Sequence, residues 1–272
     1  RTARRSPSSR SLSDLTRRAA AGELSCRTQG RARPNRIARR PGQSRLDLAQ
    51  TNVNITKSII PQITAVAPNA VYIIVSNPVD ILTYVFCKHS GIPENQIIGS
   101  GTILDTARLR SRLAEIFSIN MQNVHGCVLG EHGDSSFVPW SLITISGTPV
   151  DTYAQAKGLD IEGCGFNHAE IEDYVRKSGG IIIDDKGATS YAVSLSVNHI
   201  CSCIFRGIDT ALPVSTMMNG EYGISDVCIS TQSIIGKGGV TGKLISPMTE
   251  DEIAKLRASA DKLKSVISSL TI

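Results

Sequence analysis

The hydrophobic pattern separates a long, regularly patterned body from an amino-terminal stretch without periodicity. Residues 46–66 carry apolar side chains at helical spacing, and residues 69–77 form a short β-branched run typical of a buried parallel strand. Pro78 suits the first turn of a following helix, residues 97–101 are a second strand candidate, and residues 102–119 have the spacing of an amphipathic helix. This alternation predicts a parallel sheet with crossover helices.

The second half of the chain has a different pattern. Residues 127–147 predict two strands around a polar turn, and the strand-like runs within 211–240, broken by glycine and asparagine, predict antiparallel hairpins. Further helical patterns occupy residues 166–178 and 188–205. A last helix is expected over 249–270, where Thr249 and Glu252 have the spacing of a capping box. The sequence therefore predicts an α/β protein whose second part is of the α+β kind.

Composition excludes several classes of protein. Hydrophobic residues make up 41% and charged residues 19% of the 272 positions, which is the balance of a globular protein rather than a fibrous or disordered one. No apolar run is long enough for a transmembrane helix. The seven cysteines lack CxxC spacing, so we expect reduced thiols in a cytoplasmic protein and no metal site.

Charge is divided unevenly along the chain. Residues 1–40 hold twelve Arg and no Lys against two acidic residues, whereas the other 232 residues hold 17 basic and 22 acidic side chains. The body is therefore mildly acidic, which does not favour a nucleic-acid surface. Residues 1–37 are a transit peptide, a basic arm for an acidic partner, or an aberrant segment such as an out-of-frame translation joined to the body.

Five polar residues of the body are candidates for chemistry. Asp105 and Arg108 lie three residues apart on a predicted helix, so both can face one cleft. His132 lies in a glycine-flanked turn, Asn77 ends a predicted buried strand, and Arg45 follows a flexible loop. Each alone also has an ordinary structural explanation, such as a surface ion pair for Asp105 and Arg108.

The order and wording of five motifs are more specific. These are PGQSRLDLAQTN, VSNPVD, GSGTILDTARLR, GEHGDSS and KGATSYA. Together they resemble the lactate/malate dehydrogenase family, most of all its bacterial allosteric L-lactate dehydrogenase branch, from about Ala38 to the carboxyl terminus. The resemblance implies the remnant of a doubly wound Rossmann-type parallel sheet followed by an α+β substrate or catalytic domain. We place an aberrant or disordered segment at 1–37, a truncated NAD-binding domain at 38–100 and the catalytic domain at 101–272.

The resemblance also implies a mechanism, in which NADH reduces pyruvate reversibly to L-lactate, a reaction of glycolysis and fermentation. His132 would exchange a proton with the substrate oxygen, and Asp105 would fix its ring. Arg108 would bind the substrate carboxylate through two parallel hydrogen bonds. Arg45, on a loop that closes over the site, would polarise the carbonyl, and Asn77 would hold the substrate and the ribose beside the nicotinamide.

Other positions matching the family extend the site. Val75 and Asn52 join Asn77 as cofactor-binding candidates, and Thr189 is a substrate-binding candidate. Arg39, six residues before Arg45, stands where malate enzymes carry the Arg that pairs with a second carboxylate. Thr189, Thr106 and the GEHGDSSF stretch instead resemble the lactate branch, which we favour over a malate dehydrogenase.

Two positions concern regulation and assembly. Arg110 and His125 match the Arg and His with which allosteric members bind fructose 1,6-bisphosphate between subunits. Solvated helix and strand-edge roles are the alternative for these two residues. The resemblance implies a homotetramer, with neither nucleic acid nor membrane as a partner.

One family feature has no counterpart in this sequence. Family members carry a GxGxxG turn after the first strand, whereas the glycine cluster here, 236–242, lies near the carboxyl terminus and predicts a hairpin turn. A parallel sheet without its first strands has an unpaired edge. We therefore expect this chain to be unstable and to bind NAD poorly, so a non-catalytic fragment remains an alternative to a working enzyme.

Overall fold

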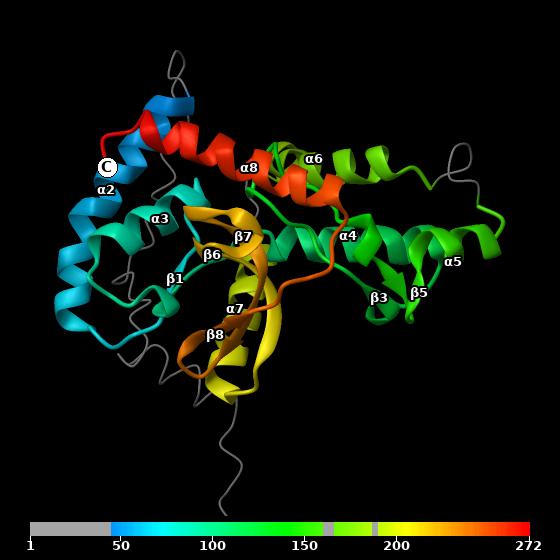
Figure 1. The fold of residues 1–272 in the computed structure, drawn as a ribbon, viewed down its shortest axis with the longest axis horizontal. Helices are drawn as coiled ribbons and strands as arrows, with labels where there is room; N and C mark the ends of the chain where they lie inside the picture. Colours follow the sequence, from blue (N-terminus) through cyan, green and yellow to red (C-terminus); the bar gives the residue numbers. More distant parts are fainter. Residues whose placement is uncertain (1–44, 160–165, 187–189) are drawn as a thin grey trace, which may run out of the picture.

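The computed structural model describes residues 45–159, 166–186 and 190–272 (Figure 1). Its helices are α2 (Arg45–Val66), α3 (Val79–His89), α4 (Ile103–Phe117), α5 (Val150–Ala156), α6 (His168–Lys186), α7 (Ser190–Arg206) and α8 (Glu250–Ser268). Short 3₁₀ turns are η1 (Glu94–Gln96), η2 (Met121–Asn123), η3 (Trp140–Leu142) and η4 (Glu221–Gly223). The strands are β1 (Tyr72–Ile74), β2 (Ile97–Gly99), β3 (Val124–His125), β4 (Thr144–Ile145), β5 (Thr148–Pro149), β6 (Thr210–Asn219), β7 (Ser225–Gly236) and β8 (Gly239–Lys243).

A five-stranded sheet joins the two halves of the chain in the order β1-β2-β6-β7-β8. Strands β1 and β2 are parallel, as the strand–helix alternation predicts, and the remaining pairs are antiparallel. The halves meet where Gly99 of β2 pairs with Ser215 of β6. A Cβ at Gly99 would lie 2.4 Å from Thr83 Oγ1 and 2.9 Å from Ser215 Cβ, so only glycine allows this approach.

The glycine cluster near the carboxyl terminus forms the predicted hairpin turn. Gly236 and Gly239 are paired across the β7–β8 hairpin, and Gly239 has a φ of +102°. Its missing Cβ would lie 2.2 Å from the carbonyl oxygen of Asn95, so both the backbone angle and the space require glycine. This cluster therefore closes a hairpin.

The pattern over 127–147 is misleading in one respect. The pattern predicts two strands there, but the only ladder strand within this range is β4, while Leu129 and Phe137 form an isolated antiparallel bridge with two backbone hydrogen bonds of 3.0 Å. The intervening residues fold into turns, and Pro139 leads into η3. Because proline lacks an N–H, it cannot extend the ladder beyond Phe137.

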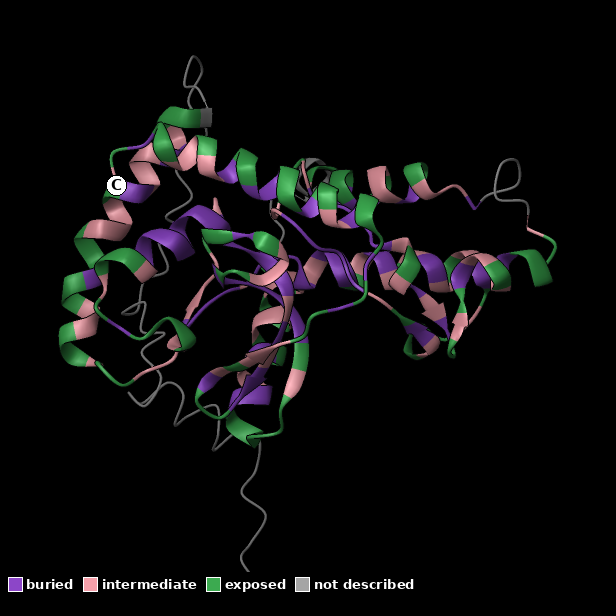
Figure 2. Ribbon diagram, in the orientation of Figure 1, coloured by how far each residue is buried: buried purple, intermediate pink, exposed green. Residues whose placement is uncertain are grey.

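Helices α2, α3 and α8 and the five-stranded sheet build the main core. Apolar faces of α2, α3 and α8 pack together and against the sheet, burying Val53, Val85 and Leu256 (Figure 2). The end of the chain returns to α2, where the backbone N–H of Thr271 donates to Gln50 Oε1 at 2.8 Å.

Helix α3 starts at Val79, so Pro78 is its N-cap residue rather than part of its first turn. The capping box of α8 is present as predicted.

A second core lies beneath the small sheet, whose order is β3-β4-β5. Leu109 and Leu113 of α4 are fully buried there against α5 and α6. Helix α4 thus connects the two parts of the protein.

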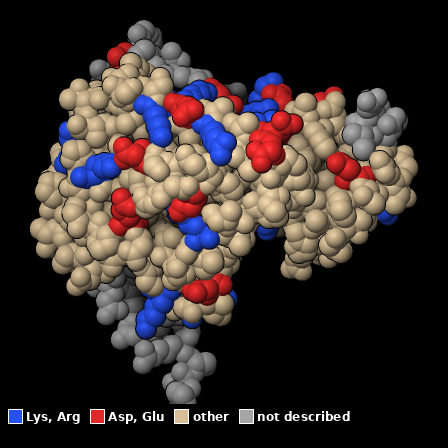
Figure 3. Space-filling model, in the orientation of Figure 1, with Lys and Arg blue, Asp and Glu red and all other residues tan. Residues whose placement is uncertain are grey.

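On the face drawn in Figure 3, basic and acidic side chains are interspersed. None of the helices in the described ranges has the length and apolar character that a membrane span needs.

Candidate active site

Helix α4 is held in place by hydrogen bonds to the segment that leads to the glycine-flanked turn. Thr102 Oγ1 donates to the carbonyl of Val128 at 2.5 Å, and the backbone N–H of Val128 donates to Thr106 Oγ1 at 2.9 Å. All three residues are buried. The first turns of α4, which carry Asp105 and Arg108, are therefore fixed relative to residues 130–136.

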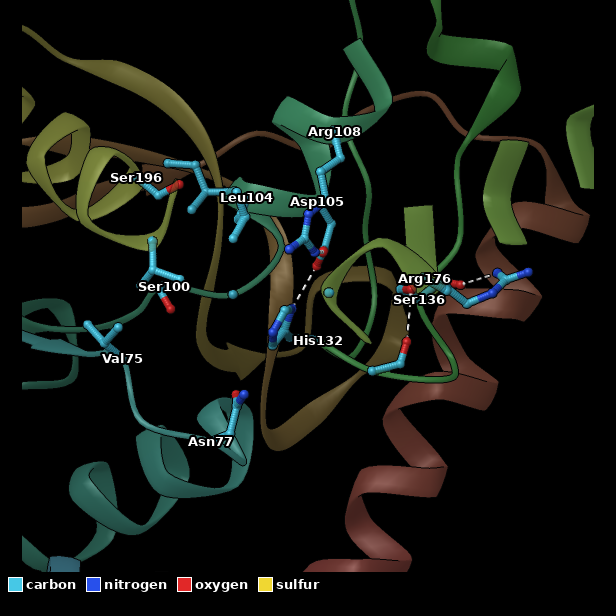
Figure 4. A pocket seen from close by; sticks show the side chains of 15 residues that line it. Val75, Asn77, Ser100, Leu104, Asp105, Arg108, His132, Ser136, Arg176 and Ser196 are labelled. Atoms are coloured by element: carbon cyan, nitrogen blue, oxygen red, sulfur yellow. Dashed lines mark hydrogen bonds and ion pairs between the residues drawn. The ribbon is translucent and has the colours of Figure 1, made fainter. Parts of the chain in front are cut away.

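Asp105 binds two cationic partners at once. His132 Nδ1 lies 2.6 Å from Asp105 Oδ2, and Arg108 Nη1 lies 2.9 Å from Asp105 Oδ1. The Asp105 and Arg108 side chains are only 8% and 13% exposed, so water screens these interactions weakly. The contact leaves the other ring nitrogen of His132, Nε2, available for a substrate (Figure 4).

A second carboxylate, Asp80, contacts the backbone of His132. The backbone N–H of His132 donates to Oδ2 of Asp80, a residue of α3, at 2.8 Å. Asp80 is buried, and its Oδ1 has no hydrogen-bond partner among the described residues. Burial raises the pKa of Asp80 to about 6. The Ser215 hydroxyl and the backbone N–H of His132 favour the ionised carboxylate and so lower this pKa, but by less than burial raises it.

The environment of His132 favours its protonated form. Burial alone would lower the pKa of this ring, but the hydrogen bond and negative charge of Asp105, with the charge of Asp80, outweigh burial and the repulsion from Arg108. The net result is a raised pKa, so more of the imidazole is protonated at neutral pH than in a solvated histidine.

These groups line a cavity of about 210 Å³. Figure 4 shows His132 and Arg108 on its walls, with Asn77 and Val75 entering from the carboxyl end of β1. The other lining residues are Ser100, Gly101, Ile103, Leu104, Asp105, Gly133, Ser136, Arg176, Gly179, Val193 and Ser196. The cavity therefore lies at the carboxyl edge of the parallel strands, where open α/β sheets bind ligands.

Two candidates from the cofactor set are connected to each other. Asn52 Nδ2, on α2, donates to the backbone carbonyl of Asn77 at 3.0 Å. Val75 and Asn77 line the cavity directly. These three residues could hold one end of a dinucleotide beside His132, while no GxGxxG turn for a pyrophosphate occurs among the described residues.

Two further candidates, Arg110 and His125, do not line this cavity, and the side chains of three others lie outside the described part of the chain. Arg110 points away from the cavity, because its Nε donates to the carbonyl of Gly126 at 3.0 Å, and it lines a second cavity of about 400 Å³. His125, next to Gly126, is exposed on β3. Arg45 is the first residue of α2, and its side chain is outside the description, as are Arg39 and Thr189 altogether.

Two charged residues of the site are not among the candidates that the sequence motifs indicate. Asp80 is the only carboxylate in the apolar run PVDILTYVF, and a single charged residue in such a run would have marked it as a candidate. Arg176 of α6 lines the cavity, and its Nη1 donates to the carbonyl of Ser136 at 3.0 Å and lies 3.1 Å from Glu172 Oε2. Nothing in the local sequence distinguishes Arg176 from a solvated helical arginine.

Comparison with known proteins places the chain in a family. The family model for the NAD-binding domain of lactate/malate dehydrogenases matches residues 34–99, and that for their α/β C-terminal domain matches residues 102–271. The chain belongs to the lactate/malate dehydrogenase family. Its fold is accordingly a partial NAD-binding Rossmann domain with the α/β C-terminal domain of that family.

Individual relatives point to the lactate branch of the family. The chain is 43% identical over 235 residues to the L-lactate dehydrogenase of Thermoanaerobacter sp. (strain X514), covering 86% of this chain and 75% of that one. It is 43% identical over 228 residues to the enzyme of Bifidobacterium animalis subsp. lactis, covering 83% and 70%. The chain is thus a homologue of NAD-dependent L-lactate dehydrogenases.

Solved structures of L-lactate dehydrogenases are also similar to this chain over most of its length. The ligand-bound crystal structure of the minor L-lactate dehydrogenase from Enterococcus mundtii has a TM-score of 0.81 at 35% identity, covering 87% of this chain and 74% of that one. The L-lactate dehydrogenase from Clostridium thermocellum has a TM-score of 0.75 at 39% identity, covering 85% and 75%.

Proposed function

We propose that this site reduces pyruvate to L-lactate, reversibly and with NADH, by the residues already placed around the cavity. The observation that carries the proposal is the 2.6 Å contact between His132 and Asp105 in a cavity that Arg108 also lines. A proton-exchanging ring and a guanidinium within one small cavity suit a 2-oxo acid, which presents a carbonyl oxygen beside a carboxylate.

His132 is the proton donor. When bound, NADH supplies the hydride that reduces the keto carbon. The protonated ring donates its Nε2 proton to the carbonyl oxygen as negative charge develops there, and Asp105 stabilises the protonated ring and fixes its tautomer. In lactate oxidation, neutral His132 accepts the hydroxyl proton. The raised pKa of His132 keeps the donor form populated near neutral pH.

Arg108 binds the carboxylate of the substrate. Its Nη1 is held by Asp105, which orients the planar guanidinium within the cavity. Gly179 of α6 faces this group: a Cβ there would lie 3.6 Å from both terminal nitrogens of Arg108. The small residue leaves the guanidinium accessible from that side. Arg45, which begins α2 rather than lying on the expected loop, is proposed to polarise the carbonyl.

Lactate, rather than malate, is the proposed product. The similarity to L-lactate dehydrogenases and the lactate-like motifs favour pyruvate, whereas Arg39 would favour oxaloacetate. The test compares kcat/KM for the two acids in a chimaera, defined as this chain with residues 1–37 replaced by the corresponding amino-terminal segment of the Thermoanaerobacter sp. enzyme, so that Arg39 is kept. We expect pyruvate to be preferred. A preference for oxaloacetate would identify a malate dehydrogenase.

The 272-residue polypeptide itself is proposed to bind NADH weakly. Its sequence contains no GxGxxG turn whose backbone N–H groups would hold the pyrophosphate. This favours a second candidate function for the polypeptide, a non-catalytic subunit that associates with intact subunits. Mixing it with the chimaera and following activity and mass would separate the two functions.

Regulation and assembly complete the proposal. We place fructose 1,6-bisphosphate at Arg110 and His125, with the protein acting as a cytoplasmic homotetramer. The support is that Arg110 contacts the residue next to His125, so both side chains belong to one region of the surface. Activity of the chimaera is expected to rise when fructose 1,6-bisphosphate is added, and Arg110→Gln should abolish that rise while leaving basal activity intact.

A further inference from the structure

The turn that carries His132 is held by a helix far away in sequence. Ser259 of α8 is 1% exposed, and its Oγ accepts the backbone N–H of Glu131 at 2.9 Å. The same oxygen lies 2.9 Å from Ser135 Oγ. One buried hydroxyl therefore fixes the turn immediately before His132 and again three residues after it.

The surroundings of Ser259 reinforce this contact. Ser135 Oγ also donates to the carboxylate of Glu131, and Lys262, one turn further along α8, lies 3.7 Å from Glu131 Oε2. Gly130 has a φ of +95°, and a Cβ there would lie 3.0 Å from Ser259 Oγ. A side chain at Gly130 would therefore crowd the Ser259 hydroxyl, and the φ value also favours glycine there, so the turn packs closely against α8.

Helix α8 is a rigid support for such a contact. Its first turn is capped by Thr249 and Glu252, and the carboxylate of Glu252 also accepts the backbone N–H of Ser141 at 3.0 Å. Leu256 and Leu263, on either side of Ser259, are buried in the main core. Since buried residues flank Ser259 along the helix, its hydroxyl has little freedom to follow a displaced turn.

We propose that Ser259 is a positioning residue for His132: it holds the turn from α8 while Asp80 holds it from α3, so that the ring meets Asp105. This role rests on the proposed function of His132 as the proton donor. It makes α8, which does not line the cavity, part of the active-site architecture.

The test uses the full chain without substrate or cofactor. The His132 ring is titrated by NMR in the wild type, in Ser259→Ala and in Ser233→Ala. Ser233 is the matched control, because its buried Oγ bonds Thr216 Oγ at 3.1 Å in the β6–β7 pair, away from the turn. Circular dichroism verifies that each variant is folded.

We expect Ser259→Ala to lower the pKa of His132 by about 0.5–1 unit, since the charged pair with Asp105 loses its geometry. Ser135→Ala, at a half-buried position that tolerates the change, should shift it in the same direction by less. Ser233→Ala should leave it unchanged. An unaltered His132 titration in folded Ser259→Ala and Ser135→Ala would overturn the positioning role without bearing on dehydrogenase activity.

Discussion

Replacing Asp105 with asparagine keeps the shape of the side chain and removes its charge. Two interactions change together: the 2.6 Å contact with His132 and the 2.9 Å contact with Arg108. Removing the carboxylate charge leaves the buried guanidinium of Arg108 without its partner, which costs about 3 kcal/mol. The contact with His132 is strong only while the ring is protonated. It adds about 1.5–3 kcal/mol for a charged hydrogen bond, falling to about 1 kcal/mol for a neutral one.

The sign of the pH dependence follows from the raised pKa of His132. A raised folded-state pKa contributes stability that is fully present below the unfolded value of about 6.5 and is lost as pH rises through the folded value. The difference in free energy of unfolding between wild type and Asp105→Asn should therefore be larger at acidic than at alkaline pH, by about 1 kcal/mol or more. Asp80 titrates nearby but is present in both proteins, so its contribution cancels to first order.

Urea unfolding of both proteins between about pH 5.5 and 9 measures this difference. Asp151→Asn is the control, because it removes a comparable contact of 2.8 Å with His168 in which the carboxylate is 44% exposed. That exposed pair should contribute no more than about 1 kcal/mol. A wild-type minus Asp105→Asn difference that does not vary with pH would refute the assigned coupling of Asp105 to His132.

Three further predictions concern binding and stability. Arg108→Lys should lower kcat/KM for pyruvate in the chimaera about 10–100-fold, mostly through KM, because lysine cannot form two parallel hydrogen bonds; steady-state kinetics would detect it. Burial raises the pKa of Glu252, but hydrogen bonds from Ser141 and Thr249 outweigh burial, so the net pKa is lowered. The ionised carboxylate therefore contributes stability to the protein that is lost as pH falls through this lowered pKa. Glu252→Gln should make the free energy of unfolding depend less on pH in the acid range, as followed by circular dichroism. Fluorescence titration should show NADH binding this chain at least about 100-fold more weakly than the chimaera, since two lost charge-assisted hydrogen bonds already cost about 3 kcal/mol.

Local patterns were enough to predict the helices and the local partners in the site. The amphipathic spacing of α4 placed Asp105 and Arg108 on one side of a helix, and the glycines around His132 predicted its turn. The hairpin of residues 236–242 followed from turn chemistry alone. In each case the residues that determine the structure are neighbours in sequence.

The supports of the turn were not predictable in this way. Asp80 lies 52 residues before His132, and Ser259 lies 128 residues after Glu131. The pairing of Gly99 with Ser215, which joins the two halves of the sheet, likewise links distant segments. Contacts of this kind depend on how finished elements pack, and neither hydrophobic period nor turn composition records them.

The most direct test of the account is pyruvate-dependent oxidation of NADH by the chimaera, with and without His132→Asn, at matched NADH saturation. We expect rapid turnover for the parent chimaera and a loss of at least about 100-fold in kcat for the variant, in keeping with the worth of a positioned acid–base group. Equal rates in the two proteins would show that His132 is not the proton donor and would contradict the function proposed for this site.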